Sequence, residues 1–201
     1  MESFTRVSSV AAVLAMPNVD TDRIVPAKFL HNPRSAGYGQ FLFHDLRRDA
    51  QGNERPDFVL NQAPYRNARI LIADANFGCG SSREGAVWAL YGFGIRTVIA
   101  SSFGDIFFEN SFKNGLLPVA LPEAGLLRLR AAVATDPLAN LEVDLEQQIV
   151  SAPGGEVFRF EVDAFKRTSL LLGLDDIGVT LQHLGEIESF ERHRKQHTPW
   201  L

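Results

Sequence analysis

The 201-residue sequence contains a single cysteine, Cys79, so an intrachain disulfide is excluded and a reducing compartment is indicated. One thiolate cannot hold an iron–sulfur cluster by itself, because such clusters take several ligands. We therefore expect this chain to ligate no metal and no cofactor on its own.

Long apolar runs, excess basic charge and targeting signals are also lacking. No stretch approaches the roughly 18 uninterrupted apolar residues of a membrane span, and residues 1–6 do not resemble a signal peptide. The formal net charge of −4 argues against a nucleic-acid partner, which requires a basic surface. Apolar residues still make up 45% of the chain, which suits a globular core. We expect a cytoplasmic protein without nucleic-acid or membrane partners.

The middle of the chain alternates between short apolar runs and helical patterns. Strands are expected at 7–14, 69–73, 97–100 and 116–121, and helices at 83–91, 103–113 and 123–134. This alternation predicts an α/β fold with a partly parallel sheet. Between positions 20 and 61, proline and glycine interrupt every apolar piece, and a long irregular segment of this kind is more often functional than disordered.

The last third of the chain has a different pattern. Alternating residues at 141–145 and 158–162 flank a Pro153–Gly155 turn, which predicts a β-hairpin. Helices are expected at 166–172 and 176–190, and the polar end is expected to fray. We expect one domain over 1–201, with a core of about 1–135, a hairpin and helices at 136–190, and a polar tail at 191–201.

The segment from Asn76 to Glu84 has the composition of an anion-binding loop. Glycines at 78 and 80 permit positive φ angles and close approach of a ligand. Ser81, three residues before Glu84, predicts a capping box, and free N–H groups at a helix N-terminus attract anions. Arg83 adds a forked donor for a carboxylate. The expected guest is a small carboxylate or phosphate.

Three other loop types are excluded by single positions. A dinucleotide fingerprint would need glycine in place of Arg83, and a nucleophile elbow would need glycine in place of Glu84. A phosphate-binding Walker loop would need a lysine, which this stretch lacks. A plain strand-to-helix turn with a good cap remains the structural alternative.

The loop resembles the swivelling-domain motif of the aconitase superfamily, in particular that of the small subunits of bacterial 3-isopropylmalate dehydratases. Segments 18–26, 102–118 and 163–182 are similar to further signatures of that family, in the same order. The resemblance implies a β/β/α swivelling domain with a partly parallel central sheet and a C-terminal hairpin and helices.

The resemblance also implies a hydro-lyase that works with a large subunit. A [4Fe–4S] cluster in that partner would bind the hydroxyl of a dicarboxylate substrate, and 2- and 3-isopropylmalate would be interconverted in leucine biosynthesis. In this chain Ser81 matches the catalytic base, which acts as an alkoxide. Gly80, Ser82 and Arg83, with Arg34 and Asp22 from the irregular segment, would bind substrate.

Two departures from the family pattern leave the substrate open. Gly85 stands where the motif usually has histidine, and Arg34 is shifted by one residue in the substrate-recognition loop. Another hydroxy-dicarboxylate such as methylmalate or citraconate, a non-catalytic anion- or partner-binding subunit, and a free-standing anion-binding protein remain alternatives. Asp22 either positions an arginine or makes local turn hydrogen bonds, as Asp20 is expected to do. Asn110 and Asn114 are expected to fix a helix end rather than touch substrate.

Overall fold

The computed structural model describes residues 1–198 and contains two four-stranded sheets. One sheet is parallel, in the order β2-β3-β4-β5. Its strands are β2 (Ala11–Leu14), β3 (Ile70–Ala73), β4 (Thr97–Ala100) and β5 (Leu117–Ala120). Three of these strands lie where the apolar runs predict them. Their near-continuous burial is typical of a parallel sheet that is covered on both faces.

Two helices cross between the parallel strands. They are α3 (Glu84–Phe93) and α4 (Asp105–Lys113). Leu71 and Val98 of the sheet share one apolar core with Val87 of α3 and with Phe107 of α4. This side of the sheet therefore carries the loop that the sequence singles out.

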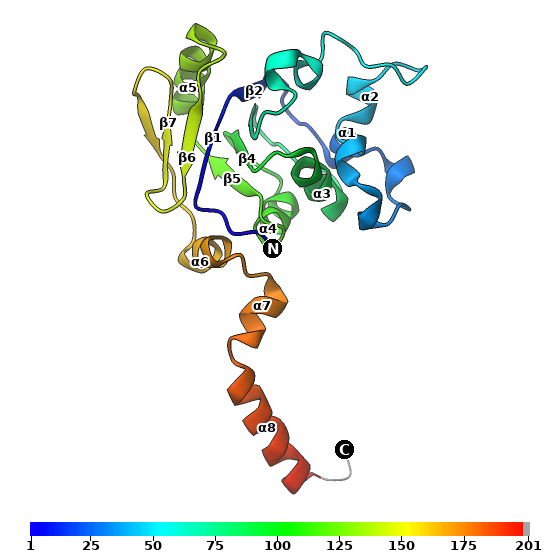
Figure 1. Ribbon diagram of the computed structural model, residues 1–201, viewed down its shortest axis with the longest axis vertical. Coiled ribbons are helices and arrows are strands. Elements are labelled where there is room, and N and C mark those ends of the chain that lie inside the picture. Colours follow the sequence, from blue (N-terminus) through cyan, green and yellow to red (C-terminus); the bar gives the residue numbers. More distant parts are fainter. Residues whose placement is uncertain (199–201) are drawn as a thin grey trace.

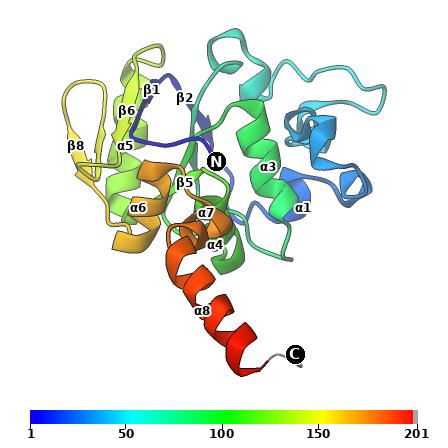
Figure 2. The ribbon, with the colours of Figure 1, turned by 60° about the horizontal axis from the view of Figure 1, so that its bottom comes forward.

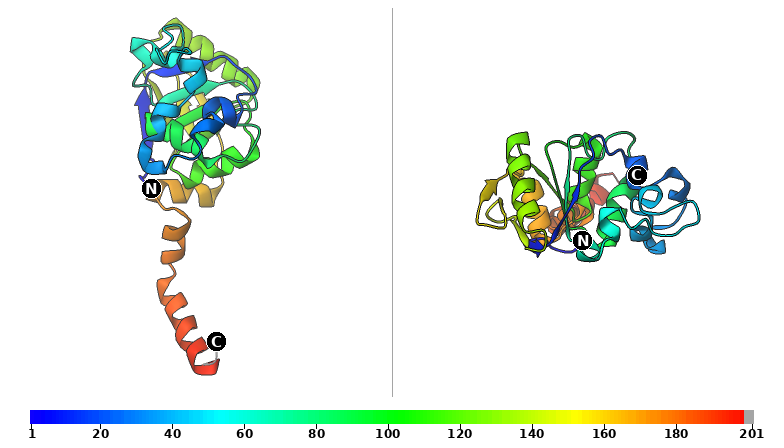
Figure 3. Two further views of the ribbon diagram at one scale, coloured as in Figure 1. Left: turned by 90° about the vertical axis from the view of Figure 1, so that its right-hand side faces the viewer. Right: turned by 90° about the horizontal axis from the view of Figure 1, so that it is seen from above.

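The second sheet is antiparallel and covers the opposite face. Its strands, in spatial order, are β1 (Arg6–Ser9), β6 (Leu141–Asp144), β7 (Ile149–Ser151) and β8 (Val157–Arg159). Ile70 and Ile72 of the parallel sheet pack in one core with Val143 of β6 and with Leu129 of α5 (Glu123–Thr135). The view from above shows these layers side by side (Figure 3). The expected β/β/α architecture is confirmed.

The run at 7–14, expected as one strand, is two strands in different sheets. Val10 alone separates β1 from β2. The Ser9 hydroxyl donates to the Val10 carbonyl (2.9 Å) and accepts from the Arg69 amide (3.0 Å), which secures the crossing point. No glycine, proline or charged residue interrupts positions 7–14, so the sequence could not reveal the change of sheet.

The expected C-terminal hairpin has a third strand. The Pro153–Gly155 turn is present, but it joins β7 to β8 and not the 141–145 segment to the 158–162 segment as predicted, because a second turn joins β6 to β7. In that turn the Asp144 carboxylate accepts from the Gln147 amide (2.8 Å), and Gln148 adopts a positive φ of 55°. No glycine or proline marks this turn, and Asp144, although a common turn residue, also fits the alternating pattern at 141–145, so β7 was not predicted from the sequence.

Three helices form the C-terminal end: α6 (Ala164–Leu172), α7 (Asp176–Leu181) and α8 (Leu184–His197). The helix expected at 176–190 is broken at 182–183, and the end expected to fray is helical to His197; residues 199–201 lie outside the described part. Helices α7 and α8 project from the body as an arm (Figures 1 and 2). Within residues 1–198, no helix has the length and apolar character needed to cross a membrane.

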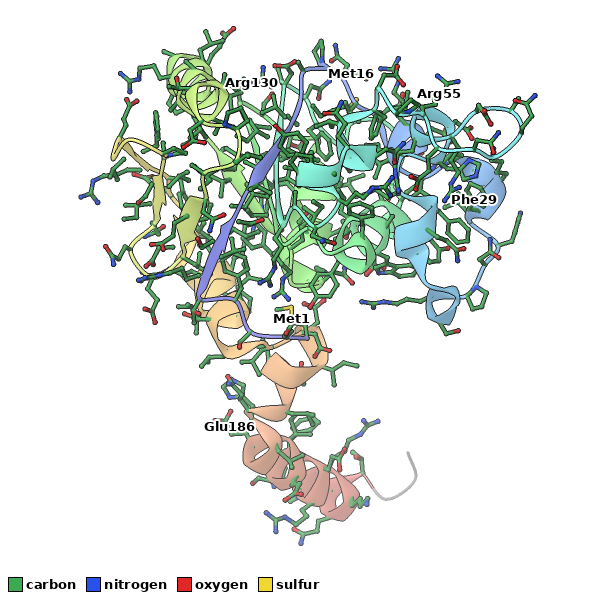
Figure 4. The ribbon with its side chains drawn as sticks, turned by 45° about the horizontal axis from the view of Figure 1, so that its top comes forward. Met1, Met16, Phe29, Arg55, Arg130 and Glu186 are labelled. Atoms are coloured by element: carbon green, nitrogen blue, oxygen red, sulfur yellow. The ribbon has the colours of Figure 1, made fainter. Side chains whose placement is uncertain are left out.

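The irregular segment between β2 and β3 folds into short helices that lie on α3. They are α1 (Thr21–Ile24), α2 (His44–Arg47) and single turns at Ala27–Phe29, Arg34–Ala36, Tyr38–Phe41, Val59–Asn61 and Ala63–Tyr65. A Cβ on Gly39 would meet the Gly92 backbone of α3 at 2.4 Å, so the backbone of this segment and that of α3 are in direct contact at the two glycines. Phe29 and Arg55 of this segment lie on the opposite side of the molecule from Arg130 of α5 (Figure 4).

Candidate active site

Three loops meet beyond the carboxyl ends of the parallel strands. The amide of Gly78, in the loop after β3, donates to Val19 O in the loop after β2 (2.7 Å), and the Thr21 amide donates to Cys79 O (2.9 Å). On the other side, the Phe77 amide donates to Ser102 O in the loop after β4 (3.1 Å). This end of an open parallel sheet is where α/β proteins bind ligands.

The two glycines of the loop after β3, Gly78 and Gly80, have different roles. Gly78 has a φ of +74°, and a Cβ there would lie 2.2 Å from the Phe107 ring, so this glycine lets the loop pack on α4. Gly80 has a φ of +90° and is exposed, with no atom closer than 3.5 Å to such a Cβ. Only Gly80 leaves backbone open to a ligand.

Ser81 and Ser82 are exposed at the mouth of this loop. Neither hydroxyl has a hydrogen-bond partner within residues 1–198, whereas the backbone is held by the Thr21 hydroxyl, which donates to Ser81 O (2.9 Å). The backbone N–H groups of residues 80–83 likewise reach no acceptor in that part of the chain. The loop thus offers hydroxyls and N–H donors on a fixed backbone.

The expected capping box does not form. Helix α3 begins at Glu84 with Arg83 as its N-cap, and no side chain caps it. The Glu84 carboxylate instead accepts from the Asn114 side chain (2.8 Å). The helix N-terminus does lie in the loop as predicted, and its positive end remains uncovered beside the serines.

Arg83 is held by Asp22 across the two loops. Arg83 Nη2 donates to Asp22 Oδ2 (2.7 Å), Nη1 contacts Oδ1, and Nη1 also donates to Val25 O (3.5 Å). The Arg83 hydrogen bond lowers the pKa of Asp22 below its ordinary 3.8, and the same bond raises the pKa of Arg83. Asp22 therefore positions an arginine, while Asp20 caps α1 by accepting from the Arg23 amide (2.7 Å).

Arg34 lies apart from this pair. Its guanidinium stacks over the Trp88 ring of α3 at 5.1 Å and lines a cleft of about 430 Å³ with Glu84. Gly85 explains one departure from the family pattern, because a Cβ there would lie 3.0 Å from the Tyr38 ring. The structure gathers Asp22, Gly80, Ser81, Ser82 and Arg83 at one place and puts Arg34 on the neighbouring face of the same helix.

The described residues do not gather a metal-binding set. Across positions 1–198, no group of three or more His, Cys, Asp and Glu side chains could hold a metal ion. Cys79 is half-buried, and its backbone is part of the bridge to Thr21. These residues do not fit an iron–sulfur cluster, so no step of the chemistry can be assigned to one held by this chain.

Comparisons with known proteins identify the family of this chain. A model of the aconitase C-terminal domain matches residues 1–124, and the LeuD_N model matches 128–164. A model of the C-terminal domain of 3-isopropylmalate dehydratase small subunits matches 176–201. The 3-isopropylmalate dehydratase small subunit of Dinoroseobacter shibae is 51% identical over the full length of both chains. The chain belongs to the family of 3-isopropylmalate dehydratase small subunits.

Other members of the small-subunit family give the same result. The small subunit of Rhodospirillum centenum is 54% identical over 100% of this chain and 98% of its own length. A crystal structure of 3-isopropylmalate dehydratase (LeuD) from Methanocaldococcus jannaschii superposes with a TM-score of 0.66 over 92% of this chain and 99% of that one. At 24% identity this likeness concerns the fold alone. The sequence of the arm also belongs to the family pattern, because the third model covers residues 176–201.

Asp22→Asn should weaken substrate binding more than it weakens the fold. The Asp22 carboxylate is 56% exposed, so loss of its ion pair should lower the free energy of unfolding by less than about 1 kcal/mol. KM should nevertheless rise about fivefold, because the neutral amide holds the Arg83 guanidinium less firmly. Steady-state kinetics of the two-subunit enzyme and thermal unfolding of the chain measure the two effects.

The pH dependence gives a control for that variant. Because the folded-state pKa of Asp22 lies below 3.8, the pair is intact across the neutral range and is lost only as pH falls through the lowered pKa. The KM difference between variant and wild type should therefore stay constant between pH 6 and 8. A difference that varies over this range would mean that another titrating group holds Arg83.

Proposed function

We propose that this chain is the small subunit of a 3-isopropylmalate dehydratase, which interconverts 2- and 3-isopropylmalate by removing and re-adding water in leucine biosynthesis. Full-length similarity to proteins of that name supports the proposal. The observation that carries it is the loop of exposed Ser81 and Ser82 beside an arginine fixed by Asp22. A cytoplasmic location belongs to the same proposal.

In this proposal Ser81 is the base. Its oxygen takes the proton from the carbon next to the one that bears the hydroxyl, and returns it when water adds in the opposite sense. A serine alkoxide is far too basic to form unaided, so it needs nearby positive charge. The uncovered N-terminus of α3, the free N–H groups of residues 80–83 and the guanidinium of Arg83 are the available sources.

Arg83 is proposed to bind a substrate carboxylate while Asp22 holds its other edge. Asp22 and Val25 O engage both Nη atoms, but Nε–H and one Nη2–H have no partner within residues 1–198. A guanidinium can donate hydrogen bonds to two carboxylates, one on each of two edges. Here one carboxylate would be that of Asp22 and the other that of a ligand. Ser82 and the open backbone at Gly80 lie beside it and would complete the carboxylate site.

We propose further that the enzyme is completed by a large partner protein, which holds a [4Fe–4S] cluster. Such a cluster supplies a Lewis acid for the hydroxyl that leaves. Support comes from what the site offers within residues 1–198: a candidate base and an anion cradle, but no set of side chains that could hold a metal ion to assist departure of a hydroxyl. The oligomeric arrangement, heterodimer or larger, belongs to the same proposal.

The test is turnover by the reconstituted two-subunit enzyme. Both isopropylmalates and the methylmalate/citraconate pair should be assayed with the large subunit from the same organism. Higher kcat/KM on isopropylmalate supports the proposal, and preference for the methyl compound would replace its substrate. Turnover by the small subunit alone, or none on any of these acids with an intact cluster, would refute it.

A further inference from the structure

Asn114 is a buried side chain whose amide is bound at both ends. It is 4% exposed and follows directly on α4. Its Oδ1 accepts from Trp88 Nε1 (3.0 Å), and its Nδ2 donates to Glu84 Oε1 (2.8 Å) and to Asn110 O (2.9 Å). A side-chain amide has only two N–H donors, so both are used and the orientation of the group is fixed.

The two partners of Asn114 bear on different parts of the site. Glu84 is the first residue of α3 and follows Arg83 directly. Trp88, one turn farther along, carries the Arg34 guanidinium on its ring at 5.1 Å. The buried Asn114 amide therefore connects Glu84, at the start of α3, with the Trp88 ring that the Arg34 guanidinium contacts.

Trp88 also supports the rest of the Arg34 segment. The Tyr38 ring meets Trp88 edge-on, with centroids 5.3 Å apart, and the Tyr38 hydroxyl donates to Asn32 O (3.0 Å). The segment from 32 to 38 is thus fixed relative to Trp88 on both sides of Arg34. A shift of the indole would move this segment as a unit.

A shared cleft makes this connection relevant to a ligand. Arg34 and Glu84 both line the cleft of about 430 Å³, and Asn114 forms part of its wall. The other lining residues are Asn110, Lys113, Asp175, Asp176 and Ile177. The cleft lies mainly between the end of α4 and the start of α7, and Glu84 of α3 and Arg34 contribute one side chain each. Asn114 therefore binds one lining residue, Glu84, directly, and it binds the ring that carries the other, Arg34.

We propose that Asn114 is a positioning residue that fixes the spacing between Arg34 and the Gly80–Arg83 loop, an inference that rests on the proposed function. The family resemblance assigns both Arg34 and the Gly80–Arg83 loop to the binding of one substrate, so the distance between them would decide whether the substrate carbon that loses its proton lies beside Ser81. A misplacement of about 1 Å can cost a hundredfold in rate. Asn114 itself touches neither substrate nor the reacting atoms.

Asn114→Asp tests the contact with Glu84. The new carboxylate can still accept from Trp88 but faces the Glu84 carboxylate at hydrogen-bond distance, where like charges repel. We expect kcat/KM of the two-subunit enzyme to fall about tenfold. Glu84→Gln alone should cost only about twofold, because its amide oxygen can still accept from Asn114.

The decisive measurement is the exchanged pair. In the double variant Glu84→Gln/Asn114→Asp, the new amide at 84 can donate to the new carboxylate at 114, which restores the bond in reverse. The double variant should be about fivefold more active than Asn114→Asp alone. Ser111→Ala is the matched control: it removes a buried hydrogen bond to Phe107 O (2.7 Å) in the same turn of α4, and kcat/KM should stay at the wild-type value.

A spectroscopic readout separates this inference from the proposed function. Trp88 and Trp200 are the two tryptophans, so the full chain should give two indole N–H resonances, and Trp88→Phe assigns them. Asn114→Leu, which removes the acceptor, should shift the Trp88 resonance upfield, whereas Ser111→Ala should leave it in place. Should Asn114→Asp fail to fold, Trp88→Phe takes its place in the kinetic test and should raise KM at least threefold.

The outcomes are distinct. If the wild-type enzyme is active and Asn114→Asp is equally active, the positioning role is overturned. It is also overturned if the exchanged pair is no more active than Asn114→Asp alone. A wild-type enzyme inert on every acid tested, with the indole resonance shifted as expected, would refute the proposed function and leave the hydrogen-bond network intact.

Discussion

Replacing Ser81 with alanine should lower kcat of the two-subunit enzyme about a thousandfold, the usual contribution of a positioned general base. The Ser81 hydroxyl is exposed and has no hydrogen-bond partner within residues 1–198, so its removal leaves no buried group unsatisfied. KM should change little, because the carboxylate cradle of Arg83 and the loop N–H groups remains. Initial rates at saturating substrate give kcat directly.

Two comparisons make the Ser81 result interpretable. The melting temperature of Ser81→Ala should match that of wild type, since Thr21 binds the Ser81 carbonyl rather than its hydroxyl. Ser82→Ala, one residue along, should raise KM severalfold and leave kcat within about threefold. If both serine variants lose kcat equally, Ser81 is not the base; if neither does, the chain is a non-catalytic subunit.

Arg83→Lys is the second large effect we expect, a fall of about a hundredfold in kcat/KM. Arg83 occupies one edge of its guanidinium with Asp22 and has Nε–H and one Nη2–H left over within residues 1–198. Lysine keeps the charge but has a single nitrogen, which cannot hold Asp22 and a substrate carboxylate in fixed directions. The loss should appear in both KM and kcat, because the same charge stabilises the alkoxide.

Its matched control lies on the same surface. Arg23, next to Asp22, is exposed, and within residues 1–198 its guanidinium makes one hydrogen bond, a weak one to the Met16 sulfur (3.5 Å). Arg23→Lys should leave kcat/KM at the wild-type value. Should Arg83→Lys retain more than half of the activity, the guanidinium is a structural partner of Asp22 and the carboxylate is bound elsewhere.

Much of the fold could be predicted because its local signals are strong. The strand at 97–100 is a continuous apolar run with β-branched residues, and the structure has it at those bounds. The Ser81–Glu84 spacing also predicts the helix after the serine loop, and Asn114-Gly115 predicts where the next helix ends; both helices are present. These elements depend on their own residues.

The rest depends on contacts between distant segments. Asp22 and Arg83 are 61 positions apart, and their pairing follows only from the neighbouring positions of β2 and β3 in the sheet. Glu84 was expected to cap its own helix, but Asn114, 30 residues away, competes for its carboxylate. The sequence around Asn114 does not predict its bond to Glu84. It shows only an asparagine before a glycine, which predicts the end of a helix.

The single residue between β1 and β2 has a mechanical consequence. The link at Val10 is short and the two sheets also share one apolar core, so the antiparallel sheet moves together with the strand whose following loop holds Asp22. The two sheets and the serine loop would then move as one rigid body, and the geometry of the loop would not change. Opening or closing over a substrate would then require movement of this whole body relative to its partner subunit, and not of one sheet relative to the other.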